Sequence, residues 1–272
     1  MILDRFRMPD QVAIVTGASS GIGRACALAF AEVGARVVCA ARGEERLERV
    51  VARIREHGGT ALAVPCDVRD EAQVKELVAR AASTFGRVDV VVNNAGGTGP
   101  TPALDLSVAD FEAAFRFNVS SAFLLTRLSV PHMLEAGGGS VLNISSALSH
   151  LVESCFVAYG TCKAALNHMT RLLAHEFAPH IRVNALAVGA TVTDSLSPIL
   201  KADPELGRKM EDMTPMARLA TPEDIACAAL YLASPASSWV TGKIFEVDGG
   251  TVASNWPIPI PTGLPARKRS DA

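Results

Sequence analysis

Several signals of secretion, metal binding and membrane insertion are missing from this sequence. Its six cysteines form no CxxC pair and show no histidine spacing of the kind that holds zinc. Charged residues interrupt the first ten positions, so the apolar core of a signal peptide is absent there. No apolar run approaches the roughly 18 residues that a membrane span needs. We therefore expect reduced cysteines, a cytoplasmic location, no metal site and no membrane partner.

Neither sign of charge is in excess, because 26 basic side chains face 28 acidic ones and the formal net charge is −2. Such a balance gives no broad attraction to nucleic acid or to an anionic membrane. The basic run at 267–269 lies beside Asp271 near the C-terminus and is most simply a solvated end. We expect a small-molecule partner and no nucleic acid.

What the sequence does contain is an alternation of short apolar runs, rich in β-forming residues, with longer segments of helical period. This pattern is typical of repeated βαβ units, which cover both faces of a parallel sheet with helices. Strands are predicted at residues 12–16, 36–40, 61–65, 88–93, 140–145, 182–187 and 244–248. Helices are predicted at residues 21–33, 44–56, 71–85, 108–135, 158–178 and 222–233, the fourth broken near Asn118. We predict an α/β fold with one doubly wound, parallel, seven-stranded sheet in a single domain at residues 1–255.

Two stretches do not fit the alternation. Residues 191–215 separate the sixth strand from the last helix, and a connection of this length is usually functional, so we expect a substrate lid there. Residues 256–272 are rich in proline, which excludes a helix or a central strand. We expect this tail to be an extended arm or to be disordered.

A glycine-rich turn follows the first predicted strand and runs directly into a helix. Gly17, Gly21 and Gly23 let the backbone turn tightly and approach a pyrophosphate, whose charge then meets free N–H groups at the helix N-terminus. Their spacing is not GxGxxG, and an ordinary strand-to-helix turn is the alternative. The strand before the turn and the helix after it favour a dinucleotide site.

The second predicted strand leads to Ala41 and Arg42, about twenty residues further on, where a dinucleotide-binding fold places the side chain that reads the ribose. A carboxylate there binds the ribose hydroxyls of NAD and repels a 2′-phosphate, whereas Arg42 offers a phosphate-binding guanidinium. The sequence therefore favours NADP(H). NAD(H) is the alternative if Arg42 is only a solvated residue at the start of a helix.

Tyr159 and Lys163 are four residues apart at the start of a predicted helix, hence on one face and within mutual reach. A phenol with a pKa of about 10 exchanges protons poorly at neutral pH, and a neighbouring cation lowers that pKa by stabilising the phenolate. Ser146 follows the fifth strand, at the edge of the sheet where α/β folds bind ligands. We predict an acid/base centre at Tyr159, with Ser146 holding the substrate oxygen.

Together with further motifs, these residues resemble the short-chain dehydrogenase/reductase family over nearly the whole chain. The motifs occur in family order: TGASSGIG at 16–23, NNAG at 93–96, Asn118, Ser146, YGTCK at 159–163, IRVN at 181–184 and VDGG at 247–250. The resemblance implies a Rossmann-type fold and an NAD(P)-dependent oxidoreductase that acts on CH–OH groups. It also implies a homotetramer assembled through two helix faces and the last strand.

The resemblance implies roles for individual residues as well. Tyr159 is the expected catalytic acid/base, Lys163 binds the nicotinamide ribose and tunes Tyr159, and Ser146 orients the substrate oxygen. Asn118 is expected to bend its helix and to hold a water in a proton relay through Lys163. The expected cofactor contacts are Gly17, Ser19, Ser20, Gly21, Ile22, Gly23, Arg42, Asp67, Val68, Asn94, Ala95, Gly96, Tyr159, Lys163, Gly189, Val192 and Thr193.

Two positions depart from the family pattern. Val188 stands where the family usually has proline, at the end of the sixth strand, which puts the rigidity of that loop in doubt. Ser20 stands where many NADP-using relatives carry Arg or Lys, so the expected NADP preference depends mainly on Arg42.

The expected substrate is a carbonyl compound or a secondary alcohol. The stretches 214–216 and 239–242 resemble bacterial hydroxysteroid dehydrogenases, which implies a bulky, apolar, steroid-like substrate. A reductase of carrier-linked 3-oxoacyl thioesters is the alternative among enzymes. A catalytically silent dinucleotide-binding sensor or scaffold is the alternative of another class, and the intact catalytic residues argue against it.

Three residues between Ser146 and Tyr159 belong to a segment that passes close to the substrate. These residues, His150, Glu153 and Phe156, either select the substrate or are ordinary surface-loop residues.

Overall fold

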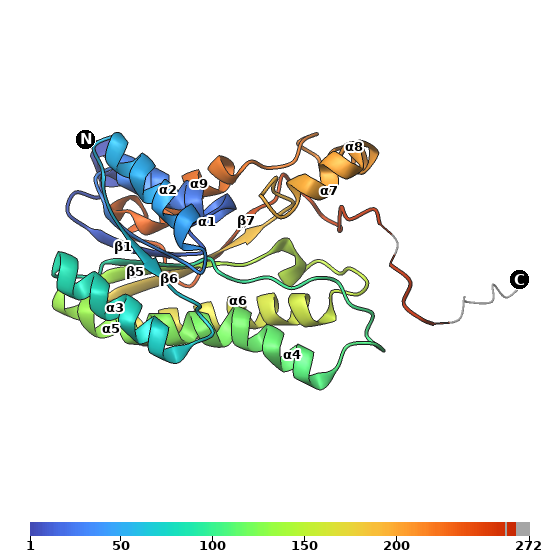
Figure 1. Ribbon diagram of the computed structural model, residues 1–272, viewed down its shortest axis with the longest axis horizontal. Helices are drawn as coiled ribbons and strands as arrows, with labels where there is room; N and C mark the ends of the chain where they lie inside the picture. The colour runs from blue at the N-terminus through green and yellow to red at the C-terminus, as the bar shows by residue number, and fades with distance from the viewer. Residues whose placement is uncertain (259, 265–272) are drawn as a thin grey trace, which may run out of the picture.

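The computed structural model describes residues 1–258 and 260–264. Within them, seven parallel strands form one sheet in the order β3-β2-β1-β4-β5-β6-β7 (Figure 1). The strands are β1 (Val12–Thr16), β2 (Arg36–Ala41), β3 (Thr60–Pro65), β4 (Val90–Asn93), β5 (Gly139–Ile144), β6 (Ile181–Val188) and β7 (Ile244–Val247). The predicted α/β fold with a doubly wound, seven-stranded parallel sheet is confirmed.

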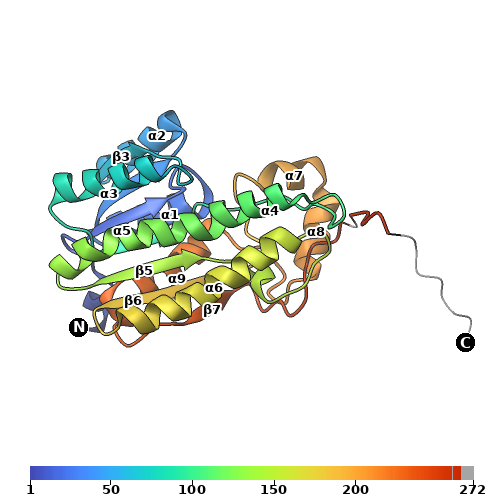
Figure 2. The same cartoon turned by 90° about the horizontal axis from the view of Figure 1, so that it is seen from below.

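Helices cover both faces of this sheet. They are α1 (Gly21–Glu32), α2 (Glu44–Glu56), α3 (Glu71–Phe85), α4 (Val108–Phe115), α5 (Ser121–Glu135), α6 (Val157–Phe177), α7 (Ser197–Ala202), α8 (Pro204–Asp212) and α9 (Pro222–Ala233). Helices α1, α2 and α9 lie on one face, and α3, α5 and α6 lie on the other (Figures 1 and 2). Strands β1 and β4 are therefore buried along their whole length, which explains their continuous apolar sequences.

Strand β4 begins two residues later than the sequence predicts. The buried carboxylate of Asp89 accepts a 2.8 Å hydrogen bond from the backbone N–H of Val12 and is also bonded by the guanidinium of Arg87. This side-chain contact adds to the backbone hydrogen bonds that Asp89 makes with Val12 and Ser140, a feature that apolar patterning does not reveal.

The predicted break near Asn118 is confirmed as a π-helical turn. Residues Arg116–Ser120 join α4 to α5 without an intervening loop. The side-chain amide of Asn118 donates a 2.9 Å hydrogen bond to the Ala114 carbonyl and accepts a 2.8 Å bond from the N–H of Gly97. Single π-helical turns within α-helices frequently lie at functional sites.

The sheet order places a ligand site at one edge. The chain order of the strands reverses between β1 and β4, and in open α/β sheets ligands bind beyond the carboxyl ends of the strands at such a reversal. The carboxyl ends of β1, β4, β5 and β6 all meet there. None of the helices in the described part of the chain combines the length and apolar character that crossing a membrane requires.

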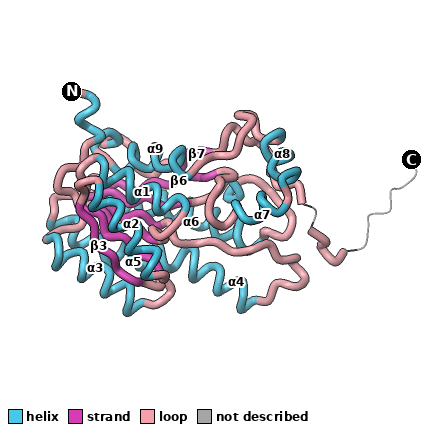
Figure 3. Tube along the Cα trace, turned by 45° about the horizontal axis from the view of Figure 1, so that its top comes forward, coloured by secondary structure: helices cyan, strands magenta, loops and turns pink. Residues whose placement is uncertain are grey.

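The segment expected to be a lid contains two short helices that the sequence analysis missed. Asp203 caps α8 through bonds from the N–H groups of Glu205 and Leu206, and proline occupies its first turn. Helices of six and nine residues are too short for hydrophobic periodicity to reveal them. They lie at the same end of the molecule as the start of α4, beyond the sheet (Figures 1 and 3).

The described part of the proline-rich tail contacts the rest of the protein at Trp256 and at the Ile260 carbonyl. Residues 256–258 and 260–264 form no helix or strand, as their prolines predict. Trp256 packs against the apolar cluster that contains Leu206 and Met210 of α8. The rest of the tail, including the basic run at 267–269, lies outside the described residues.

Candidate active site

A cleft of about 500 Å³ opens at the carboxyl ends of the strands. Most of the residues expected to bind cofactor or to catalyse line it: Gly17, Ser19, Ser20, Gly21, Ile22, Arg42, Asp67, Val68, Asn94, Ala95, Gly96, Ser146, Tyr159, Lys163, Gly189 and Thr193. Gly23, Asn118 and Val192 do not line it. The fold thus brings residues that are far apart in the sequence to one place.

The glycine-rich turn has no room for side chains. Gly17 has a φ of +65°, and a Cβ there would lie 2.5 Å from the side-chain nitrogen of Asn94. A Cβ on Gly23 would overlap the Gly17 carbonyl. Asn94 donates a 2.8 Å hydrogen bond to the carbonyl of Thr16, so the turn is tied to the end of β4. Gly23 therefore does not line the cleft, but its lack of a side chain lets the turn at Gly17 pack closely.

The N-terminus of α1 faces the cleft with free donors. Ser20 precedes the helix and, within the described residues, makes no side-chain capping bond to it. The first N–H groups of α1 are consequently available to an anion, which the helix dipole also favours. A Cβ on Gly21 would lie 3.2 Å from the Thr193 methyl group, so the first residues of the segment 191–215 lie against this turn.

Two arginines line the end of the cleft beside β2. They are Arg42, expected from the sequence, and Arg46, which the sequence analysis missed although it lies one helical turn further on. Neither pairs with a carboxylate in the part of the chain that the structure describes, in contrast to Arg49, whose partner is Glu45.

The nearby carboxylate of Asp67 is already compensated. Arg69 bonds both of its oxygens, at 2.9 and 2.6 Å, and these hydrogen bonds lower the pKa of Asp67 to about 2. Asp67 therefore adds a paired charge to the cleft.

Tyr159, Lys163 and Ser146 come together in the cleft. The Lys163 ammonium is buried, lies 5.5 Å from the centroid of the Tyr159 ring and donates a 2.9 Å bond to the Ile144 carbonyl. Burial lowers the pKa of Lys163 to about 8. Burial also raises the pKa of Tyr159, while a hydrogen bond with the Ser146 hydroxyl acts in the opposite direction.

Asn118 lies behind this group instead of in the cleft. Its side-chain oxygen would be 2.8 Å, and the Lys163 nitrogen 3.3 Å, from a Cβ built on Gly96. The amide and the ammonium therefore flank the same glycine. The absence of a side chain at Gly96 keeps the space between Asn118 and Lys163 open.

An apolar cavity of about 190 Å³ adjoins the cleft and shares Ser146, Val188 and Gly189 with it. Its other lining residues are Ala147, Leu148, Leu151, Phe156, Ala190, Leu196, Met210, Thr251, Ser254, Asn255 and Trp256. The sequence indicated Phe156 and the lid region. It gave no signal for Trp256, because a lone tryptophan in a proline-rich tail has no pattern that ties it to a cavity.

The loop at Val188 is held despite the missing proline. Val188 pairs with Val247 in the sheet, and the N–H of Gly189 donates a 3.0 Å bond to the Val247 carbonyl. A Cβ on Gly189 would lie 2.6 Å from the Cα of Asp248. Sheet pairing and close packing thus fix the loop that the sequence left in doubt.

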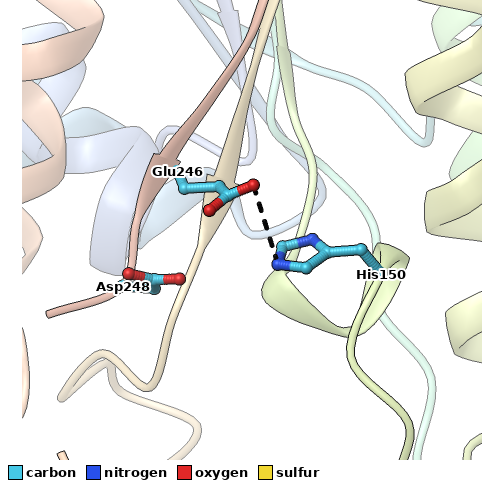
Figure 4. Close-up of side chains that lie close together, drawn as sticks. All are labelled: His150, Glu246 and Asp248. Carbon is cyan, nitrogen blue, oxygen red and sulfur yellow. Dashed lines mark ion pairs between the residues drawn. The ribbon is translucent and has the colours of Figure 1, made fainter. Parts of the chain in front are cut away.

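His150 and Glu153 line neither cavity. The His150 ring points toward the edge strand β7, where it lies 3.8 Å from a carboxylate oxygen of Glu246, with Asp248 beside them (Figure 4). These three side chains could offer ligand atoms to a metal ion. However, His150 and Glu246 are exposed, and their proximity is accounted for by a weak surface interaction between the two side chains. For His150 and Glu153 the surface-loop interpretation is favoured.

Comparisons with known proteins place this site in a family. The chain matches, over residues 17–252, the family model described as enoyl-(acyl carrier protein) reductase. It is 42% identical to the 7alpha-hydroxysteroid dehydrogenase of Escherichia coli K12, over 92% of this chain and 97% of that protein. The chain belongs to the short-chain dehydrogenase/reductase family.

This short-chain dehydrogenase/reductase has further relatives of high similarity. An uncharacterized oxidoreductase of Mycobacterium tuberculosis is 49% identical over 96% of this chain and 99% of its own length. A structure of 7alpha-hydroxysteroid dehydrogenase complexed with NADH and 7-oxo glycochenodeoxycholic acid superposes with a TM-score of 0.89, at 42% identity, over 93% of this chain and 98% of that one. The family assignment makes this protein an NAD(P)-dependent oxidoreductase of alcohol and carbonyl groups.

Proposed function

We propose that this enzyme uses NADP(H) to interconvert a bulky, apolar ketone and its secondary alcohol. The observation that carries the proposal is the position of Ser146 and Tyr159. Ser146 lines both the polar cleft and the apolar cavity, and Tyr159 lies beside it with the buried Lys163 ammonium 5.5 Å from its ring. A carbonyl held at Ser146 therefore places its apolar body in the second cavity.

The residues of the cleft fit a dinucleotide. The glycine-rich turn leaves backbone exposed where a Cβ would block approach, and the free N–H groups of α1 suit a pyrophosphate. Lys163 and Tyr159 would hold the nicotinamide ribose, and Val192 and Thr193 would reach the carboxamide from the lid. When bound, the reduced cofactor supplies the hydride.

The protein's own residues supply the proton and the orientation. In the reducing direction the Ser146 hydroxyl donates a hydrogen bond to the substrate oxygen, and the Tyr159 hydroxyl transfers its proton to that oxygen. The Lys163 cation offsets the negative charge that then develops on Tyr159. Asn118, behind Gly96, would hold a water through which Lys163 exchanges protons with solvent.

The preference for NADP(H) is supported by Arg42 and Arg46. Both line the end of the cleft beside β2, where Ala41 provides no carboxylate to bind ribose hydroxyls. The relative of 42% identity is complexed with NADH, so the preference in this chain rests on its own two arginines. A 2′-phosphate would satisfy both guanidinium groups.

Separate titrations of NADPH and NADH test this cofactor assignment. We expect wild type to bind NADPH more tightly. Arg42→Ala should weaken NADPH binding by about tenfold or more, the loss of a charge-assisted contact, and leave NADH binding nearly unchanged. Arg49→Ala is the matched control, because Arg49 lies on α2, the helix that follows Arg42, and pairs with Glu45. A wild-type preference for NADH would contradict the assignment, and binding of neither would contradict the proposed site.

The homotetramer remains part of this proposal. Phe123 on α5 and Leu172 on α6 are 44% and 57% exposed, and the two helices lie side by side on the same face of the sheet (Figure 2). Strand β7 is the last strand of the sheet and has a free edge within the described residues. Exposed apolar faces and free edges of this kind favour association. Sedimentation of the purified protein tests it.

A cytoplasmic location is likewise proposed, supported by six free cysteines.

A further inference from the structure

The C-terminal segment of the chain forms one wall of the apolar cavity. Thr251, Ser254, Asn255 and Trp256 all line it. The family model matches residues 17–252, so the last three of these residues lie beyond the stretch that it matches. The family model therefore assigns no role to this part of the wall.

Trp256 is the large side chain of this wall and connects two regions. Its ring lies 6.1 Å from the ring of Phe156 in an edge-to-face arrangement, and Phe156 lies 6.3 Å from Tyr159 in the same way. Trp256 also packs against the apolar cluster that Leu206 and Met210 of α8 form with Leu219. Trp256 is thus separated from Tyr159 by one aromatic ring.

Few polar contacts hold this segment in place. Asn255 donates a 2.9 Å bond to the Thr214 hydroxyl, and the thiol of Cys155 is 3.9 Å from the Ile260 carbonyl. The indole nitrogen of Trp256 is buried and has no hydrogen-bond partner among the described residues. Trp256 is therefore held by apolar packing, so its position is coupled to whatever fills the cavity.

We propose that Trp256 is a specificity-determining residue that selects ketones with several fused apolar rings. The inference rests on the function proposed above. With the carbonyl at Ser146, a single ring is expected to lie against Phe156, whereas further rings reach Trp256. Its flat indole face adds contact area at a small entropic cost, which favours a rigid, flat ligand over a flexible chain.

Kinetics with two ketones test this role. The probes are cyclohexanone and 7-oxo glycochenodeoxycholic acid, each with NADPH. We expect Trp256→Ala to lower kcat/KM for the four-ring ketone by about tenfold or more through KM, as for other losses of apolar contact, and to leave cyclohexanone within about twofold. Trp256→Phe should recover most of the loss. Trp239→Ala is the matched control, because Trp239 is 99% exposed.

Fluorescence gives a readout that does not depend on turnover. The chain has two tryptophans, so Trp239→Phe leaves Trp256 as the sole emitter. In complex with NADP⁺, this variant should change its emission when the four-ring ketone binds, whereas Trp256→Phe, which keeps Trp239, should not. Unchanged emission of Trp256 at saturating ketone would overturn the proposal.

The kinetic results distinguish the proposed substrate class from the proposed role of Trp256. A wild-type protein that reduces neither ketone, or cyclohexanone alone, would contradict the proposed substrate class and this role with it. If wild type and Trp256→Ala have the same kcat/KM for the four-ring ketone, only the role of Trp256 is contradicted. An equal loss with both ketones would show that Trp256 is structural.

Discussion

The ammonium of Lys163 donates a 2.9 Å hydrogen bond to the carbonyl of Ile144, the last residue of β5. This bond anchors the first turns of α6 to the end of a central strand and holds the charge 5.5 Å from the Tyr159 ring. Lys163 is 4% exposed, so the charge is kept in a poorly solvated position. Burial of this charge costs stability but places a cation next to the phenol.

Lys163→Met should therefore stabilise the free protein while removing its activity. Burial lowers the pKa of Lys163 from 10.5 to about 8. Each unit corresponds to about 1.4 kcal/mol, and the lost bond to Ile144 reduces the gain, so we expect the free energy of unfolding to rise by about 1–3 kcal/mol at pH 7. Denaturant unfolding measures it, with the exposed Lys201→Met as control.

The sign of the pH dependence follows from the same shift. Between pH 8 and 10.5 the unfolded chain binds more protons at this lysine than the folded protein does, so the wild-type contribution to stability rises with pH across that window. Lys163→Met lacks this rise, so the excess of its free energy of unfolding over that of wild type should shrink from pH 7 to pH 10. An advantage that stays constant with pH would show that Lys163 is not desolvated.

Tyr159→Phe should abolish most of the activity without loss of structure. The variant keeps the ring that packs against Phe156 and removes only the hydroxyl. General acid–base catalysis contributes about 10²- to 10⁴-fold, so we expect kcat to fall by that factor. NADPH affinity should fall much less than kcat, because Lys163 still holds the nicotinamide ribose. Tyr231→Phe is the matched control, because the chain's other tyrosine lies on α9 against Phe245. A Tyr159→Phe variant with near-normal kcat would assign the proton transfer to another group.

The sequence was informative where a residue's place is fixed by chain topology. Parallel strands must end at a common edge, so the glycine-rich turn, Asn94, Ser146 and Gly189 were predictably close together once the strands were identified. Tyr159 and Lys163 followed from helical spacing alone. These inferences need only strand direction and helix period.

The rest depends on contacts that no local pattern carries. The Ile144 carbonyl that receives Lys163 is a backbone group, and its role follows from how α6 packs on β5. Arg46 was overlooked in a helix that is rich in solvated arginines. Trp256 reaches the apolar cavity through tertiary packing of a segment without regular structure. Sequence periodicity cannot supply any of these relationships.

Thr16→Val should destabilise the carboxyl edge of the sheet. The Thr16 hydroxyl donates a 3.1 Å bond to the Val92 carbonyl and accepts bonds of 3.0 and 3.1 Å from the N–H groups of Asn94 and Ala95. Valine has nearly the same shape but removes all three bonds: the Asn94 N–H and the Val92 carbonyl keep their 3.1 Å bond to each other, whereas the Ala95 N–H loses its partner. We expect a loss of about 1–3 kcal/mol in the free energy of unfolding.

The control for Thr16→Val is the same substitution at Thr60, an exposed residue at the start of β3. There the change should be within about 0.5 kcal/mol. Equal effects at the two positions would mean that β-propensity, and not the hydroxyl at Thr16, determines the outcome.

Gly23→Ala tests whether close packing behind the turn shapes the cofactor cleft. Gly23 does not line the cleft, yet a Cβ there would overlap the Gly17 carbonyl and approach the Asn94 side chain to 2.5 Å. The turn must shift to admit it, which moves the free N–H groups of α1 away from a bound pyrophosphate. Because such placement governs charge-assisted hydrogen bonds, we expect NADPH affinity to fall by about tenfold or more. Gly99→Ala is the control, since nothing lies within 4 Å of a Cβ there. Calorimetric titration that finds equal affinities for both variants would show that the turn tolerates the methyl group and that the cleft does not depend on this contact.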